Sequence, residues 1–262
     1  MSAPGASVRS DFVTASDGVR LAFDRLGAGP AIVLVHGFGS SREQNWKSTG
    51  WYRGLTEAGF SVLAMDCRGH GKSGKPHDPA FYGHDRMAAD VTEVMDAAGL
   101  AEALVVSYSM GGFIGLRLLA AHPGRVVRLA VAGVGTSYLE DRISAPAARQ
   151  AFADALLTED PAALTDPRAI QFRAFAEQPG KDRLALAACM RAMSPHLPEA
   201  TLATLQRPVL VACGAEDDIA GDPEPLAAAI RDAMVVRIPG RDHMSAVGDR
   251  RTRQAVIDFF RG

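Results

Sequence analysis

The chain has 262 residues, of which 47% are hydrophobic and 22% charged, a composition typical of globular proteins. Its formal net charge is −2 and its pI is about 6.4, which argues against nucleic acid or an anionic membrane surface as a partner. The three cysteines, Cys67, Cys189 and Cys213, are too few and too widely spaced for a disulfide scaffold or a zinc site. We therefore expect a small-molecule ligand without strong charge.

The first residues, Met1-Ser2-Ala3-Pro4-Gly5, lack a basic region followed by an apolar stretch, so no signal peptide is expected. No apolar run in the chain approaches the length that is needed to cross a bilayer. These features predict a cytoplasmic protein with no membrane partner.

Short apolar runs alternate with amphipathic segments along most of the chain. The expected strands are residues 8–15, 19–26, 31–35, 61–65, 103–106, 127–132, 208–213 and 234–238. Ser16-Asp17-Gly18 joins the first two as a hairpin turn. The expected helices are residues 54–58, 85–98, 111–121, 223–233 and 251–260. This order predicts an α/β fold, with a mostly parallel sheet, helices on both faces and an antiparallel edge.

One region has no strand candidate. From Tyr138 to Gln206 the sequence is alanine-rich and interrupted by prolines, which predicts short helices such as 148–157, 167–177 and 183–193. A helical insertion between two strands is typical of a cap over an active site, although such helices can also simply pack beside the sheet. We expect residues 1–137 and 207–262 to form the core domain and residues 138–206 to form the cap.

The segment Ser107-Tyr108-Ser109-Met110-Gly111-Gly112 passes from a strand into a helix through a tight turn. A serine nucleophile needs such a turn, with small flanking residues, to present its hydroxyl above the sheet. The usual pattern is G-x-S-x-G, and Ser107 occupies the first glycine position. Ser107 is a rival nucleophile, but Val105 precedes it by two positions where Ser109 has a small residue, so we favour Ser109.

His36-Gly37-Phe38-Gly39 directly follows the strand 31–35. Glycine lets a backbone approach a substrate oxygen closely, and we expect the amides of Phe38 and Met110 to form an oxyanion hole. The alternative is a plain glycine turn. In either case His36 is expected to hold the loop rather than to react.

Two acidic candidates follow the strand 208–213, and a histidine follows the last strand. Asp217 is favoured over Asp218 as the acid that orients the base, because G-x-x-D is the usual spacing. His243 is expected to be the general base, since it follows both Ser109 and Asp217 in the chain. The other histidines have weaker cases and are interpreted as ordinary exposed or loop residues: His70, His77, His84, His122 and His196.

With these motifs in their order Ser109, Asp217, His243, the chain resembles the α/β-hydrolase superfamily over nearly its whole length. The segment Asp66-Cys67-Arg68-Gly69-His70-Gly71-Lys72-Ser73 is similar to the branch that contains esterases, enol-lactonases, C–C bond hydrolases and cofactor-free haloperoxidase-like enzymes. The resemblance implies an eight-stranded sheet and a cap after the sixth strand. Serine at position 109 argues against haloalkane dehalogenases and epoxide hydrolases, since those relatives use an aspartate nucleophile.

The expected activity is a carboxylesterase for small, mostly neutral acyl substrates, working through an acyl-enzyme without a metal or organic cofactor. A lactonase or a C–C hydrolase with the same triad is the alternative within this chemistry, and a ligand-binding receptor with the hydrolase fold is the alternative outside it. The ligand is expected to be an ester or lactone, and the sequence does not predict the oligomeric state. Candidate substrate-binding residues are Trp46, Tyr108, Phe172 and Met190, with Trp51 as a further apolar wall.

Overall fold

A computed structural model describes residues 7–140 and 145–262 of the chain. Its strands form one eight-stranded sheet in the order β1-β2-β4-β3-β5-β6-β7-β8. Only the pairs β1/β2 and β2/β4 are antiparallel. The strands are β1 (Arg9–Thr14), β2 (Arg20–Leu26), β3 (Ala31–Val35), β4 (Ser61–Met65), β5 (Ala103–Tyr108), β6 (Val126–Ala132), β7 (Val209–Gly214) and β8 (Met234–Ile238). All eight expected strands and the antiparallel edge are therefore confirmed.

The strand order of the sheet reverses between β3 and β5, which forms a topological switch point. From β3 the chain passes through α1 (Trp51–Glu57) to β4 on one side, and from β5 it passes through α3 (Met110–Ala121) to β6 on the other. Val35 pairs with Ser107, so the two strands end at the same level. In an open parallel sheet this switch point leaves a crevice beyond the carboxyl ends of the strands, where ligands bind.

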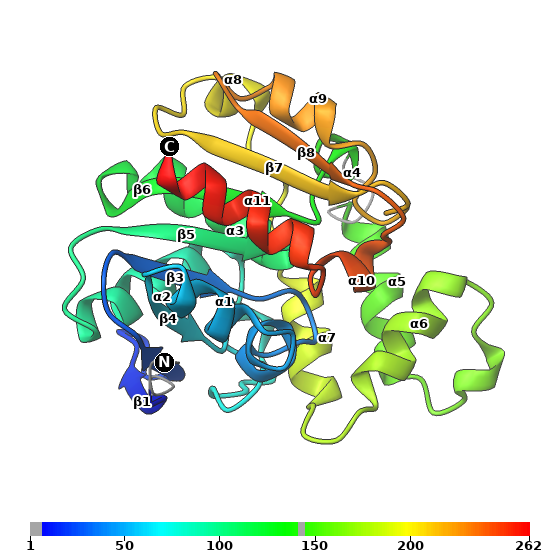
Figure 1. Cartoon of the computed structure of the whole chain (residues 1–262). Helices are drawn as coiled ribbons and strands as arrows, with labels where there is room; N and C mark the ends of the chain where they lie inside the picture. The colour runs from blue at the N-terminus through cyan, green and yellow to red at the C-terminus, as the bar shows by residue number, and fades with distance from the viewer. Residues whose placement is uncertain (1–6, 141–144) are drawn as a thin grey trace.

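Helices cover both faces of the sheet (Figure 1). On one face α1 and α11 (Arg250–Arg261) pack against alternate residues of the central strands, for example Ile32 and Leu34. On the other face α2 (His84–Ala97), α3 and α9 (Pro223–Ala228) pack against the intervening residues, such as Val33 and Val35. Because both faces are buried, the central strands are continuous apolar runs in the sequence.

The segment between β6 and β7 is helical and has no strand among its described residues. Two of its three longer helices, at residues 146–157 and 167–176, lie at the right of Figure 1, and the third, at residues 183–191, lies nearer the middle of the view. Residues 141–144, which lie inside the range expected for the cap, are outside the described part of the chain. The helices are α4 (Thr136–Leu139), α5 (Pro146–Leu157), α6 (Pro167–Ala176), α7 (Arg183–Arg191) and α8 (Glu199–Leu202).

Short helical elements complete the chain. Two of them carry site residues, a π-helical turn η1 (Glu43–Lys47) after β3 and α10 (His243–Ala246) after β8. The other three are 3-10 turns: η2 (Pro79–Phe81), η3 (Pro123–Arg125) and η4 (Pro161–Ala163).

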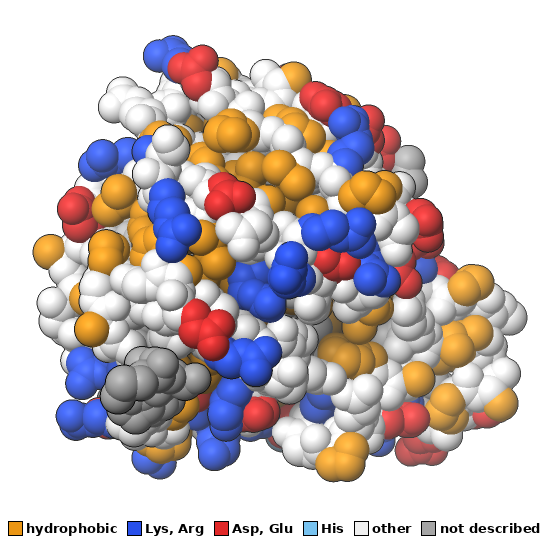
Figure 2. Space-filling model, viewed as in Figure 1, with side chains coloured by type: hydrophobic (Ala, Val, Ile, Leu, Met, Phe, Trp, Pro, Cys, Tyr) orange, Lys and Arg blue, Asp and Glu red, His pale blue; other side chains and the backbone are white. Residues whose placement is uncertain are grey.

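The surface viewed in Figure 2 carries Lys and Arg side chains across its centre, near α11, with acidic side chains beside them. Asp249, the N-cap residue of α11, pairs with both Arg241 and Arg251, so part of the positive charge near this helix is neutralised locally. None of the helices in the described ranges is long and apolar enough to cross a bilayer.

Candidate active site

Ser109 lies at the turn between β5 and α3, with a backbone conformation of φ 53° and ψ −118°. A non-glycine residue at positive φ is strained, and such turns are found where a serine nucleophile is presented. The turn needs small neighbours: a Cβ on Gly111 would lie 2.3 Å from the carbonyl oxygen of Val35, and one on Gly37 would lie 3.2 Å from the Ser109 Cβ. The tight packing of these two loops therefore depends on glycine.

The structure brings the three predicted side chains together. His243 Nε2 lies 3.0 Å from Ser109 Oγ, and His243 Nδ1 lies 3.0 and 2.9 Å from the two carboxylate oxygens of Asp217. Because an ionised carboxylate only accepts hydrogen bonds, Nδ1 is the nitrogen that donates, and Nε2 is left as an acceptor facing the Ser109 hydroxyl. The arrangement can take a proton from Ser109 and stabilise the resulting imidazolium.

The two acidic candidates differ in their contact with His243, which only Asp217 makes among the described residues. Asp217 is buried, and its Oδ1 also accepts hydrogen bonds from the backbone N–H groups of Ile219 (3.1 Å) and Ala220 (2.8 Å). These bonds fix the carboxylate in the orientation that meets His243. Asp218 is exposed, and its side chain makes no hydrogen bond to His243.

The rival nucleophile Ser107 is completely buried, and its hydroxyl donates to the carbonyl of Ala130 (3.1 Å). It therefore has no access to a substrate. The serine at the first glycine position of the motif is a packing residue inside the sheet.

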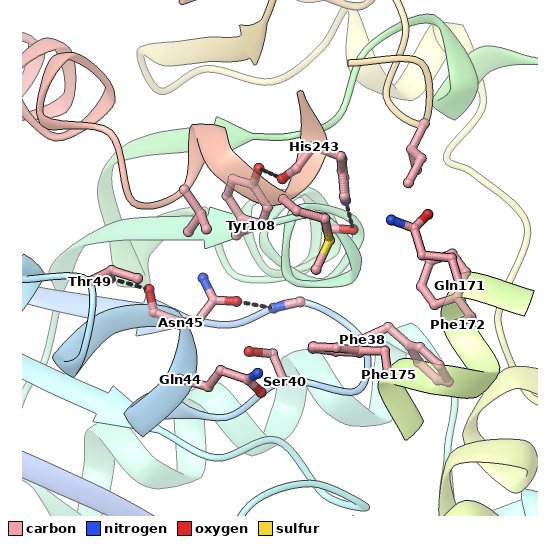
Figure 3. Close-up of a pocket in the computed structure, with 15 residues that line it drawn as sticks. Phe38, Ser40, Gln44, Asn45, Thr49, Tyr108, Gln171, Phe172, Phe175 and His243 are labelled. Carbon is pink, nitrogen blue, oxygen red and sulfur yellow. Dashed lines mark hydrogen bonds between the residues drawn. The ribbon is translucent and has the colours of Figure 1, made fainter. Parts of the chain in front are cut away.

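Tyr108 holds the loop that carries His243. Its hydroxyl donates to the backbone carbonyl of His243, as the dashed line in Figure 3 shows. On the other side of the histidine, Asp242 caps α10 by accepting the N–H of Ser245 (2.8 Å), while the Ser245 hydroxyl contacts the Asp242 backbone N–H (3.1 Å). His243 is therefore anchored through its backbone as well as through Asp217.

The loop after β3 is held by two polar side chains. His36 accepts the N–H of Cys67 at Nε2 (3.0 Å), so its Nδ1 carries the proton that is donated to the Gly37 carbonyl (2.8 Å). Burial lowers the pKa of His36 to about 4, so the ring is neutral at pH 7. Asn45 accepts the Gly37 N–H through Oδ1 (3.3 Å). The expectation that His36 holds this loop is confirmed.

The Phe38 N–H, which lies in this loop, has no hydrogen-bond partner among the described residues. Met110 is the first residue of α3, where helix geometry also leaves the N–H without an intrahelical partner. Both amides are thus available to an external acceptor beside Ser109.

Two cavities meet at Ser109. The larger cavity, of about 170 Å³, contacts Ser109 and His243 and is drawn in Figure 3, where Phe38, Phe172 and Phe175 lie together on one side and Ser40, Gln44 and Asn45 lie near one another. The smaller cavity, of about 50 Å³, contacts Ser109 and Met110 but not His243.

Residues 30–181 of the chain match the family described as alpha/beta hydrolase fold. The chain belongs to the α/β hydrolases.

This α/β hydrolase is also similar to curated and solved proteins of varied activity. It is 33% identical over 129 residues to bifunctional epoxide hydrolase 2 of Sus scrofa, a stretch that covers 49% of this chain and 22% of that protein. The chain thus spans less than a quarter of the length of that curated relative.

Two solved structures are similar over almost the whole hydrolase. A hydrolase from Pseudomonas aeruginosa PA01 is 29% identical with a TM-score of 0.77, covering 97% of this chain and 98% of that one. The enol-lactonase from Burkholderia xenovorans LB400 is 25% identical with a TM-score of 0.72, covering 96% and 100%.

Three of the four predicted substrate-binding residues lie at the cavities of the hydrolase. Tyr108 lines the larger cavity, Met190 lines the smaller one, and Phe172 lines both. The prediction for Trp46 was wrong, and so was that for Trp51. Both indoles are completely buried and pack edge-to-face on each other, with ring centroids 5.1 Å apart, in the core beneath the site.

Several lining residues were not found from the sequence. Gln44, Asn45 and Thr49 follow the Phe38 loop, Gln171 and Phe175 flank Phe172 on α6, and Met244 and Val247 follow His243. Their closeness in the chain to predicted site residues was the available signal. His84 was interpreted as an ordinary loop residue, but it begins α2, is 2% exposed and lines the smaller cavity.

The motif Asp66-Cys67-Arg68-Gly69-His70-Gly71-Lys72-Ser73 supports the site without contacting either cavity. Arg68 is buried and pairs with Asp90 (2.6 Å) and Asp17 (2.6 Å). Asp66 pairs with Arg42 and accepts its backbone N–H (2.7 Å), which fastens the chain that follows the Phe38 loop. The motif in this hydrolase is therefore structural.

No group of three or more His, Cys, Asp or Glu side chains in the described ranges could hold a metal ion. The three cysteines are free and buried. Burial raises the pKa of the thiols of Cys189 and Cys213 to about 12, so neither is a thiolate at neutral pH.

Proposed function

We propose that this hydrolase cleaves carboxylic esters of small, mostly neutral acyl groups through an acyl-enzyme on Ser109. The observation that carries the proposal is the position of the His243 ring, bonded to Asp217 through Nδ1 and to Ser109 Oγ through Nε2. This geometry supports proton transfer from a hydroxyl that a strained turn exposes to a cavity.

In the first half of the reaction His243 Nε2 takes the Ser109 proton while Oγ bonds to the ester carbonyl carbon. The carbonyl oxygen becomes an oxyanion, which accepts hydrogen bonds from the amides of Phe38 and Met110. Each such donor typically contributes about 2.7–4 kcal/mol of transition-state stabilisation. The C–O bond to the leaving group then breaks, and His243 gives its proton to the departing alkoxide, which leaves as an alcohol.

In the second half a water molecule attacks the acyl-enzyme while His243 Nε2 takes its proton. The second tetrahedral species collapses, the acid leaves, and the proton returns to Ser109 Oγ. Asp217 stays ionised and keeps the histidine in the tautomer that both steps need.

The two cavities fit the two parts of an ester. His243 must reach the leaving oxygen to protonate it, so the larger cavity, which His243 lines, takes the alcohol part. The smaller cavity, which contacts Ser109 and Met110 but not His243, takes the acyl part. Its volume of about 50 Å³ suits a chain of few carbon atoms.

Helices α5, α6 and α7 act as a cap. They supply apolar side chains to the smaller cavity, among them Phe152, Phe172 and Met190, while the sheet loops supply the reacting groups. A lid of this kind excludes water from the reacting centre. We assign residues 138–206 to this cap and residues 1–137 and 207–262 to the core.

A lactone is the second candidate substrate. It is favoured by the similarity to the enol-lactonase, which extends over 96% of this chain. The same proton transfers would open a lactone ring, with the alcohol remaining attached to the acyl product.

The proposal is tested with p-nitrophenyl acetate and butyrate and with a panel of small lactones. We expect the wild type to turn over esters and Ser109→Ala to lower kcat by roughly 10⁶-fold. Ser107→Ala is the matched control, because it removes the neighbouring hydroxyl that faces the core, and it should keep most of the activity. A wild type that hydrolyses none of these substrates would contradict the proposal.

A further inference from the structure

The smaller cavity has apolar walls that come from the core and from the helical segment. Phe113 and Met110 contribute from α3, Phe152 from α5, Phe172 from α6 and Met190 from α7. A cavity of about 50 Å³ is several times the space that one water molecule needs. Such a lining holds hydrocarbon, and any polar group in it calls for an explanation.

His84 is a polar side chain in this lining, beside the hydroxyls of Ser109 and Ser194. The residue is 2% exposed, and neither ring nitrogen makes a hydrogen bond of normal geometry with the residues that the structure describes. The Ser194 backbone lies close enough to the ring to raise its pKa, but it does not complete the hydrogen bonding of the two nitrogens. The ring stacks on Phe113, with centroids 5.3 Å apart and planes 28° from parallel. Burying a polar group without a hydrogen-bond partner is unfavourable, so an imidazole placed there is explained by a ligand that completes its hydrogen bonding.

Ser194 is a second polar residue near His84 in the smaller cavity. Its Oγ accepts the backbone N–H of His84 (3.2 Å). Burial, with a smaller effect from Arg117, lowers the pKa of His84 to about 4. The ring is therefore neutral at pH 7, with one nitrogen as a donor and the other as an acceptor. A neutral ring favours a neutral ligand group over a carboxylate.

We propose that His84 is a specificity-determining residue of the smaller cavity, where its imidazole hydrogen-bonds a hydroxyl group carried by a short acyl chain. A hydroxyl can both donate and accept, so it can satisfy either ring nitrogen, and the Ser194 hydroxyl can supply a further bond. The apolar walls receive the carbon atoms of the chain. This inference rests on the proposed function, because it places the acyl group in the smaller cavity.

The first test compares the p-nitrophenyl esters of butyrate, 2-hydroxybutyrate and 3-hydroxybutyrate, each hydroxy ester as both enantiomers. Rates are divided by the uncatalysed hydrolysis rate of each ester, which removes differences in intrinsic reactivity. We expect the wild type to favour at least one hydroxy ester over butyrate by at least about tenfold in kcat/KM, since its buried nitrogens stay unpaired with butyrate. A wild type that favours butyrate over every hydroxy ester, or treats them alike, overturns the inference.

The second test uses His84→Phe, which keeps a flat ring against Phe113 and removes both nitrogens. We expect the hydroxy ester preference to fall to about onefold or below. His84→Gln retains a donor and an acceptor and should recover part of the preference. Met193→Leu, a change in the same cavity without polar atoms, is the matched control and should keep the preference. A preference that survives in His84→Phe overturns the inference.

A binding measurement does not depend on turnover or on the stability of a His84 variant. In Ser109→Ala protein, the ring nitrogen NMR signals of His84 should shift on addition of a methyl hydroxybutyrate but not of methyl butyrate. Unchanged signals with every hydroxy ester overturn the inference. Failure of the proposed function looks different, because the wild type would then hydrolyse no ester at all, with or without a hydroxyl.

Discussion

At the scale of a single residue, the Asp217 carboxylate connects the His243 imidazole to the backbone of the turn that follows β7. It contacts His243 Nδ1 through both oxygens and accepts two backbone N–H groups from the turn that follows it. The backbone bonds fix the carboxylate, and the carboxylate fixes the imidazole. An asparagine at position 217 could keep the backbone hydrogen bonds of the turn through its amide oxygen. In one of the two orientations of its amide group, however, it would present an N–H donor to His243 instead of an acceptor.

Asp217→Asn should therefore lower kcat by about 10⁴-fold, because it disfavours the tautomer that accepts the Ser109 proton. Asp218→Asn is the matched control, since the exposed neighbour makes no contact with the base, and its kcat should stay within about twofold of wild type. The measurement is steady-state hydrolysis of p-nitrophenyl butyrate. A larger kcat loss in Asp218→Asn would overturn the assignment of the acid.

At this scale the sequence predicted Ser109, Asp217 and His243 because each lies in the turn or loop that follows a strand of a parallel sheet. It could not decide firmly between Asp217 and Asp218, since adjacent residues in a turn differ only in which one the backbone directs inward. The indoles Trp46 and Trp51 were misplaced for a similar reason. A large aromatic residue near a site loop can lie in the core or line the cavity, and the sequence pattern is the same in both cases. Only the packing in the folded structure shows which position the side chain takes.

Among the elements, the switch point between β3 and β5 positions the site. The loops after these two strands carry Phe38 and Ser109, and they approach each other because β3 and β5 are adjacent and end at the same level. Alternating strand and helix patterns were sufficient to predict this sheet, since buried parallel strands give continuous apolar runs. The strand order itself was not read from the sequence.

Element boundaries and short elements were less predictable. Helix α1 begins at Trp51 instead of residue 54, and α9 ends at Ala228 instead of residue 233. The π-helical turn η1 was not predicted, although it carries Gln44 and Asn45 to the larger cavity. A five-residue turn has too little periodicity to be recognised in a sequence, and the hydrogen bond that Asn45 accepts from the Gly37 N–H joins residues eight positions apart.

At the scale of the whole molecule, three histidines are buried in the neutral form. Burial lowers the pKa of His36 to about 4, of His70 to about 3 and of His84 to about 4. In the unfolded chain these groups take up protons near the ordinary value of about 6.5. The unfolded state therefore binds more protons than the folded state between about pH 6.5 and pH 4.

The free energy of unfolding should consequently fall as the pH is lowered through this window, by up to about 1.4 kcal/mol per pH unit for each histidine. Above about pH 6.5 the histidines contribute no pH dependence, because they are neutral in both states. Urea unfolding of wild type and His84→Phe at pH 7, 6 and 5 measures the effect. The variant keeps all carboxylates and lacks only the His84 imidazole. Its free energy of unfolding should therefore fall less steeply with decreasing pH than that of the wild type, by the contribution of one histidine. Equal slopes in the two proteins would contradict a neutral, buried His84.

The central claim is that one hydroxyl, on Ser109, is made nucleophilic by the convergence of the ends of β5, β7 and β8. Labelling of the native protein with a fluorophosphonate, followed by peptide mapping, tests it most directly. We predict a single adduct on Ser109 that is absent in Ser109→Ala and forms more slowly in Asp217→Asn. A folded wild-type protein that remains unlabelled, or that carries the adduct on another residue, would contradict it.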